Sequence, residues 1–117
     1  MNRFLMSLLC LLVFVFPAQA HSPLKVTSPA AGEILAEAPQ SINLTFAKAA
    51  RVTKVTLTYT NGDISQTDRL ELPSKKFITE MALTPELKGA GTYKVDWRAL
   101  SEDGHAIKGS FSFTVTK

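Results

Sequence analysis

The chain has 117 residues, with 13 Lys and Arg against 10 Asp and Glu, and apolar side chains make up 45% of it. A chain of this length can build one compact core but not comfortably two. Its charges are nearly balanced and dispersed, which excludes the clustered basic face expected of a nucleic-acid-binding protein.

Residues 1–20 predict a secretory signal peptide. Arg3 supplies a positive charge ahead of an almost unbroken apolar run at residues 4–16, and Ala18-Gln19-Ala20 offers small residues before a cleavage point. The apolar run is shorter than the roughly 20 residues that a helix needs to cross a membrane, so a permanent anchor is disfavoured. We therefore expect a periplasmic protein whose residues 21–117 form one domain.

The sulfur-containing residues restrict the possible metal chemistry. The single cysteine, Cys10, lies behind two leucines in the signal segment, which does not match a lipoprotein cleavage site. The processed chain then has no thiolate, which excludes Cys-based zinc, iron–sulfur and redox sites. It keeps only Met81, whereas a soft Cu(I) site needs several thioether ligands. A metal must be held by nitrogen and oxygen.

Seven segments predict β-strands, because their apolar residues alternate or because they are rich in β-branched and aromatic residues. They are residues 24–27, 42–46, 55–59, 64–72, 77–83, 93–99 and 111–115. Asn61-Gly62 is a strong hairpin signal. Thr84 as a cap and Pro85 at the first position indicate one helical turn at residues 84–87. The pattern predicts an all-β, immunoglobulin-like sandwich without a disulfide.

The processed chain has two histidines, and one of them, His21, becomes its first residue. An N-terminal histidine carries a free α-amine besides its imidazole, and the two nitrogens can close a chelate ring on one metal ion. The unperturbed amine has a pKa of about 7.7 to 8.0, so a strongly binding metal can displace its proton near neutral pH.

The second histidine closes the motif Asp103-Gly104-His105. On an extended segment the two outer side chains point to the same side, and the glycine lets the backbone bend close to an ion. With His21 they supply three nitrogens and one carboxylate oxygen, a set that suits tetragonal Cu(II). Zinc accepts the same ligands in a tetrahedral arrangement.

Other interpretations of these residues stay open. A histidine at position 21 can be an accident of processing, and Asp-Gly-His can be an ordinary polar turn. Trp97, Phe111 and Phe113 are explained by burial in the core. A hydrolase is disfavoured because no nucleophile-elbow pattern marks a serine, and nucleotide binding because no glycine-rich phosphate loop precedes a helix.

Taken together, these landmarks resemble the CopC family of bacterial periplasmic copper-binding proteins. The matching segments are His21, residues 28–32 (SPAAG), residues 42–46 (INLTF), residues 97–105 (WRALSEDGH) and residues 109–115 (GSFSFTV). The resemblance implies a seven-stranded cupredoxin-like or immunoglobulin-like β-sandwich. It also implies one Cu(II) ion per chain, held by the amine and imidazole of His21, the imidazole of His105, and Asp103.

The family resemblance predicts a non-enzymatic copper carrier or scavenger in copper homeostasis and resistance, with an inner-membrane partner resembling CopD. Two features depart from the family. The chain lacks a methionine-rich Cu(I) segment, and it has Lys48 where many members have an acidic residue that supports the copper site. The alternatives are an oxidative enzyme with a copper brace like that of polysaccharide monooxygenases, and a metal-free periplasmic interaction domain.

Overall fold

The structure, a computed structural model, describes residues 23–117, so the predicted signal peptide at residues 1–20 and His21 lie outside the described part. The regular structure of that part is all β. Its strands are β1 (Leu24–Ser28), β2 (Ile34–Leu35), β3 (Ile42–Asn61), β4 (Ile64–Arg69), β5 (Ile78–Leu83), β6 (Gly91–Ser101) and β7 (Ala106–Val115). Between residues 23 and 117 no helix has the length and apolarity that membrane crossing requires.

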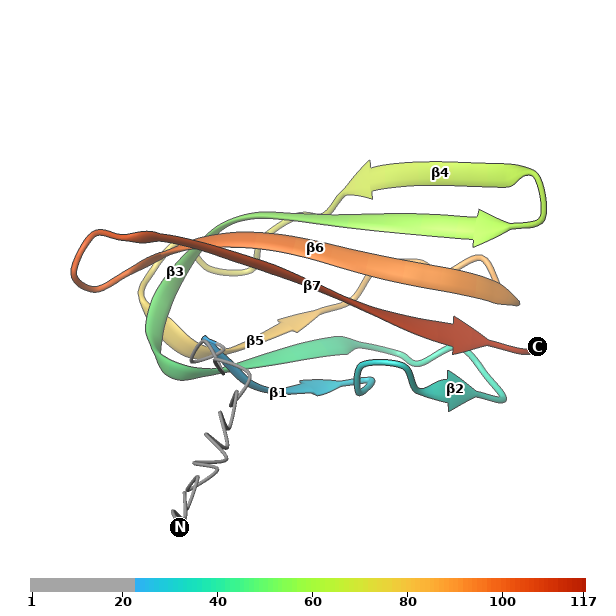
Figure 1. Cartoon of the computed structure of the whole chain (residues 1–117), viewed down its shortest axis with the longest axis horizontal. Helices are drawn as coiled ribbons and strands as arrows, with labels where there is room; N and C mark the ends of the chain where they lie inside the picture. The colour runs from blue at the N-terminus through green and yellow to red at the C-terminus, as the bar shows by residue number, and fades with distance from the viewer. Residues whose placement is uncertain (1–22) are drawn as a thin grey trace, which may run out of the picture.

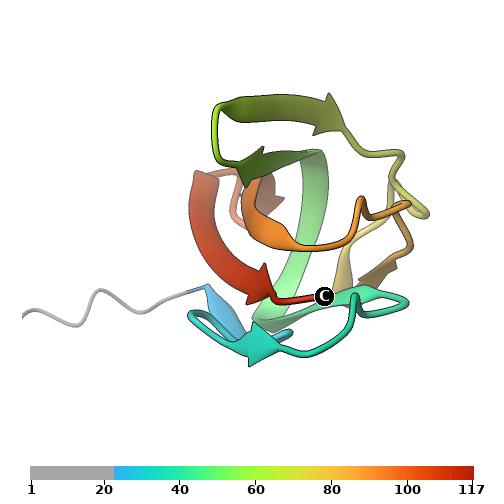
Figure 2. The same ribbon diagram turned by 90° about the vertical axis from the view of Figure 1, so that its right-hand side faces the viewer.

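The long strand β3 belongs to both layers of the fold. Its first part pairs with β1 and β5, and its second part pairs with β4 and β6. Its register shifts between Thr45 and Ala50 and again between Val52 and Lys54, where the strand bends. Figure 1 shows β3 turning at one end of the molecule and running back above its own start. Viewed from the end in Figure 2, the strands wrap into a curved β-sandwich, which confirms the predicted fold class.

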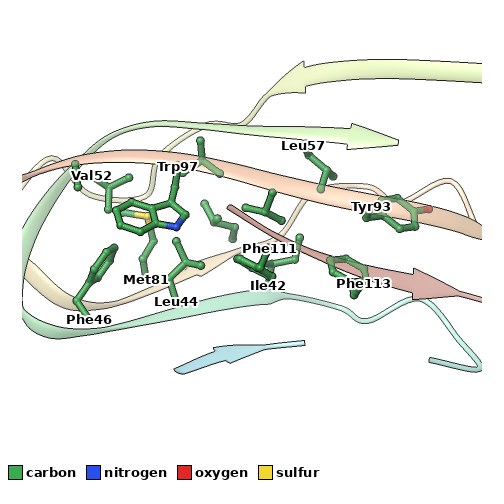
Figure 3. Packing of buried hydrophobic residues seen from close by; sticks show 14 of the residues in the cluster. Ile42, Leu44, Phe46, Val52, Leu57, Met81, Tyr93, Trp97, Phe111 and Phe113 are labelled. Carbon is green, nitrogen blue, oxygen red and sulfur yellow. The ribbon is translucent and has the colours of Figure 1, made fainter. Parts of the chain in front are cut away.

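The core lies between the two layers (Figure 3). Most of its residues come from the segments whose alternation predicted burial, and Ala50, Val52, Met81 and Leu83 are added to them. Trp97 is 2% exposed and packs edge-on against Phe46, with ring centroids 5.4 Å apart. The ring of Tyr93 stacks on that of Phe113, with ring centroids 5.2 Å apart. The buried hydrophobic residues are Ile42, Leu44, Phe46, Ala50, Val52, Val55, Leu57, Met81, Leu83, Tyr93, Val95, Trp97, Ala99, Phe111, Phe113 and Val115.

The structure departs from the predicted elements in the following respects. Residues 42–46 and 55–59 are parts of the one strand β3, which continues past the bend as residues from Ala50 onward pair with β6. The two-residue strand β2 was not predicted; it forms by parallel pairing with the end of β7. The helical turn expected at residues 84–87 is wrong, since this segment has no helical structure.

Two hairpin turns contain motifs that the sequence singled out, and the second of them contains the candidate metal ligands. Asn61-Gly62 closes the β3–β4 hairpin as predicted, with Asn61 paired to Ile64 and Gly62 at φ 59°. The β6–β7 ladder ends at the pair Leu100 and Ala106. The residues that connect these two strands therefore include the whole Asp-Gly-His motif.

Candidate metal centre

The connection between β6 and β7 is a tight turn closed by backbone hydrogen bonds. The Ser101 amide donates to the His105 carbonyl at 2.9 Å, and the Gly104 amide donates to the Ser101 carbonyl at 3.0 Å. Gly104 has φ 86°, a left-handed conformation that glycine adopts without the steric penalty of a Cβ atom. The turn fixes the backbone on both sides of the two candidate ligands.

The Asp103 carboxylate is held by hydrogen bonds within this turn. Its Oδ1 accepts from the Ser101 hydroxyl and, at 3.2 Å, from the His105 amide. Its Oδ2 lies 2.8 Å from Nδ1 of His105. The Ser101 hydroxyl, followed by the side chain and amide of His105, holds the pKa of Asp103 well below its ordinary range. Asp103 is therefore an anion at neutral pH.

The contact with Asp103 decides which nitrogen of His105 is available. Because Nδ1 faces the carboxylate, Nε2 is the nitrogen that can bind a metal. A carboxylate on the other ring nitrogen orients the imidazole, as in many metal centres. Both side chains are open to solvent, 80% exposed for His105 and 66% for Asp103.

The turn borders a depression that also includes the start of the described chain. This depression measures about 590 Å³ and is lined by Pro23, Ala47, Lys48, Ala49, Ala50, Ser101, Asp103, His105 and Ile107. The Pro23 carbonyl accepts from the Ala47 amide at 2.9 Å, and Leu24 pairs with Phe46. These backbone contacts fix Pro23 on β3, beside the Asp-Gly-His turn.

The predicted ligand His21 lies outside the described residues and precedes Pro23 by two positions in the sequence. Within residues 23–117 no three His, Cys, Asp or Glu side chains are grouped closely enough to hold a metal ion. Asp103 and His105 therefore need a donor from elsewhere, and metal binding by the three predicted residues stays a prediction.

The metal-binding interpretation considered the motif on an extended segment and left an ordinary polar turn as the alternative; in the structure Asp103 and His105 meet in a turn. Ser101, whose hydroxyl binds the Asp103 carboxylate, was not singled out. A hydroxyl two residues ahead of an acidic residue, at the end of a strand, was the available signal, because such side chains commonly hydrogen-bond within turns.

The comparisons with known proteins agree with this fold. The family model described as "CopC domain" matches residues 24–116. The chain is 37% identical over 111 residues to "Copper resistance protein C" of Escherichia coli, covering 86% of this chain and 85% of that protein. The crystal structure of CopC from Methylosinus trichosporium OB3b superposes with a TM-score of 0.61 at 26% identity, covering 82% of this chain and 94% of that one.

A second solved structure is that of PcoC, titled a methionine-rich copper resistance protein from Escherichia coli. It superposes with a TM-score of 0.61 at 33% identity, covering 83% of this chain and all of that one, 100%. The family model spans almost every described residue, and the E. coli relative matches at 37% identity over most of both chains. The chain belongs to the CopC family.

Proposed function

We propose that this protein binds one Cu(II) ion per chain through the amine and imidazole of His21, the imidazole of His105 and the carboxylate of Asp103. Membership of the CopC family supports a copper-related function. The observation that carries the proposed site is the position of Pro23, which lines the same depression as Asp103 and His105. Cleavage after Ala20 places a free amine two residues ahead of Pro23.

The donor set favours Cu(II) over other divalent ions. Three nitrogens and one carboxylate oxygen suit a tetragonal ion near the top of the divalent affinity order. The Asp103 anion offsets part of the charge of the ion, and its low pKa keeps protons from competing for the carboxylate at neutral pH. Zinc binds the same donors, but it lies below Cu(II) in this order of affinities.

The positions of Asp103 and His105 define how both can reach one ion. In the structure Oδ2 contacts Nδ1, whereas Nε2 points away from the carboxylate, so Asp103 orients the imidazole. Coordination of the same ion by Asp103 requires a rotation of either side chain. Both are largely exposed, so neither rotation disturbs the core.

The exposure of the site fits a carrier or scavenger better than a reaction centre. A copper ion on the Asp-Gly-His turn is accessible to an incoming ligand, which allows transfer to a partner. We propose that the protein acts without catalysis in copper homeostasis and resistance in the periplasm. Its predicted recipient is an inner-membrane protein resembling CopD.

The role of the free amine can be tested with two forms of the protein. One form begins at His21, and the other carries one additional alanine ahead of it, which converts the amine of His21 into an amide. Competition titrations with a Cu(II) chelator should show binding at least about tenfold weaker in the extended form. His105→Ala in the first form should also weaken binding. Equal affinity of the two N-terminal forms would overturn the proposed site.

A further inference from the structure

A row of three cations crosses the outer face of the sheet formed by β3, β6 and β7. Lys54 pairs directly with Arg98, and Arg98 pairs directly with Lys108. All three side chains are exposed, while the alternating neighbours Val55 and Trp97 face the core. We call Lys54, Arg98 and Lys108 the cation row.

The cation row is not neutralised within the described part of the chain. Between residues 23 and 117 the ion pairs within 4.0 Å are Lys94 with Asp96 at 3.9 Å, and His105 with Asp103. No member of the row takes part in either. Like charges directly opposite each other on neighbouring strands destabilise a sheet. The arrangement is therefore unfavourable for folding alone and favourable for holding an anion.

The same face is hollowed and carries hydroxyl groups. A depression of about 450 Å³ is lined by the cation row and by Thr56, Asp96, Trp97, Gly109 and Ser110. Thr56 and Ser110 flank Asp96 in the next cross-strand row, so their hydroxyls lie on either side of the single acidic residue. Asp96 itself is 3.9 Å from Lys94, which reduces its repulsion of an anion.

We propose that the cation row binds a phosphate group, supplied either by free phosphate or by a phospholipid headgroup. Neighbouring strands lie about 4.8 Å apart, so the two lysine side chains can converge on an anion held by the central arginine. The planar guanidinium binds phosphate oxygens through two parallel hydrogen bonds. A phosphate offers more acceptor oxygens and more negative charge than a carboxylate, and so it fits three cations flanked by hydroxyls.

This inference is independent of the copper site, because no member of the row is a proposed copper ligand. It is tested on copper-free protein, with inorganic phosphate titrated at constant ionic strength against chloride. Amide NMR signals of Thr56, Arg98 and Ser110 should shift and saturate. The row variant, Lys54→Gln with Arg98→Gln and Lys108→Gln, should bind phosphate roughly tenfold or more weakly.

A matched variant controls for the loss of net charge. Lys25→Gln with Arg69→Gln and Lys75→Gln removes the same residue types outside the depression, and should bind phosphate as wild type does. Without phosphate, the row variant should melt at or above the wild-type temperature, because the repulsion is relieved. Phosphate should raise the melting temperature of wild type and of the control variant, but not that of the row variant.

Vesicles distinguish the two sources of the phosphate group. Sedimentation with phosphatidylglycerol vesicles that is lost in the row variant and reduced by free phosphate would assign the site to a lipid headgroup. Saturable binding of phosphate without sedimentation would assign it to the free anion. The proposal is overturned if the row variant and the matched variant bind both probes equally. Copper titration of the row variant separately reports on the proposed function.

Discussion

Nδ1 of His105 lies 2.8 Å from Oδ2 of Asp103, so the carboxylate fixes the imidazole with Nε2 directed away from it. Asp103→Asn replaces the anion with a neutral amide of the same shape, and should weaken Cu(II) binding by roughly 10- to 100-fold. Chelator competition measures the effect. Glu102→Gln makes the same chemical change in the same turn and should leave the affinity unaltered; an equal loss in both variants would show that only the overall charge matters.

The hydrogen bonds to Asp103 also predict how the turn responds to acid. Its pKa in the folded protein lies well below the ordinary value of 3.8, because Ser101 and His105 donate to the carboxylate. The ionised group therefore contributes stability that is fully present above about pH 4 and is lost as the pH falls through the folded pKa. In copper-free protein, the carboxyl carbon NMR signal of Asp103 should show its protonation step only below about pH 4. A protonation step of this carboxyl group centred above this range would contradict the assigned hydrogen bonds.

Lys48 places a positive charge at the edge of the depression that contains Asp103 and His105. Removing a nearby positive charge should favour binding of a cation, so Lys48→Gln should bind Cu(II) roughly threefold more tightly at low ionic strength. The gain should shrink in salt, because ions screen exposed charges. Lys117→Gln, an exposed lysine beyond the end of the β6–β7 ladder opposite the Asp-Gly-His turn, serves as the control. Tighter binding that is unchanged by salt would point to a contact other than the charge.

The packing of Trp97 predicts that Gly109 cannot accept a side chain. A Cβ atom at Gly109 would lie 2.7 Å from Cζ2 of Trp97 and 2.9 Å from its Cε2. Gly109→Ala should therefore lower the free energy of unfolding by about 1–3 kcal/mol, the usual cost of overpacking a core. Urea unfolding followed by Trp97 fluorescence measures the change. Ser112→Ala on the same strand should be nearly neutral, and similar losses in both variants would reject the steric explanation.

Most of the core could be predicted because burial leaves a local pattern. Residues 93–99 and 111–115 alternate strictly, and their apolar members are buried in β6 and β7. The bend of β3 could not be predicted in this way, because the segment AKAAR at residues 47–51 lacks a clear alternation. Its contacts are with distant parts of the chain: the Ala47 amide bonds to the Pro23 carbonyl, and Ala50 and Arg51 pair with β6.

The candidate site, like the core, was predicted only as far as its features depend on residues close together in the sequence. The types and spacing of Asp103 and His105 identified the turn as a candidate for metal binding. Its proximity to Pro23 could not be derived from the spacing, because it depends on β1 pairing with β3 and on β6 pairing with the bent part of β3. The pairing of β2 with β7 was also not predicted, because a strand of two residues is too short to show an alternating pattern.

The position of the bound ion is the most direct test of the proposed copper site. Cu(II) is paramagnetic and broadens the NMR signals of nearby nuclei. With one equivalent added to protein beginning at His21, we expect broadening centred on Leu24, residues 47–50 and residues 101–107. Signals at the opposite end, including Gly62 and Gly89, should stay sharp. Broadening centred elsewhere, or none at all, would contradict a copper site formed by the chain start and the Asp-Gly-His turn.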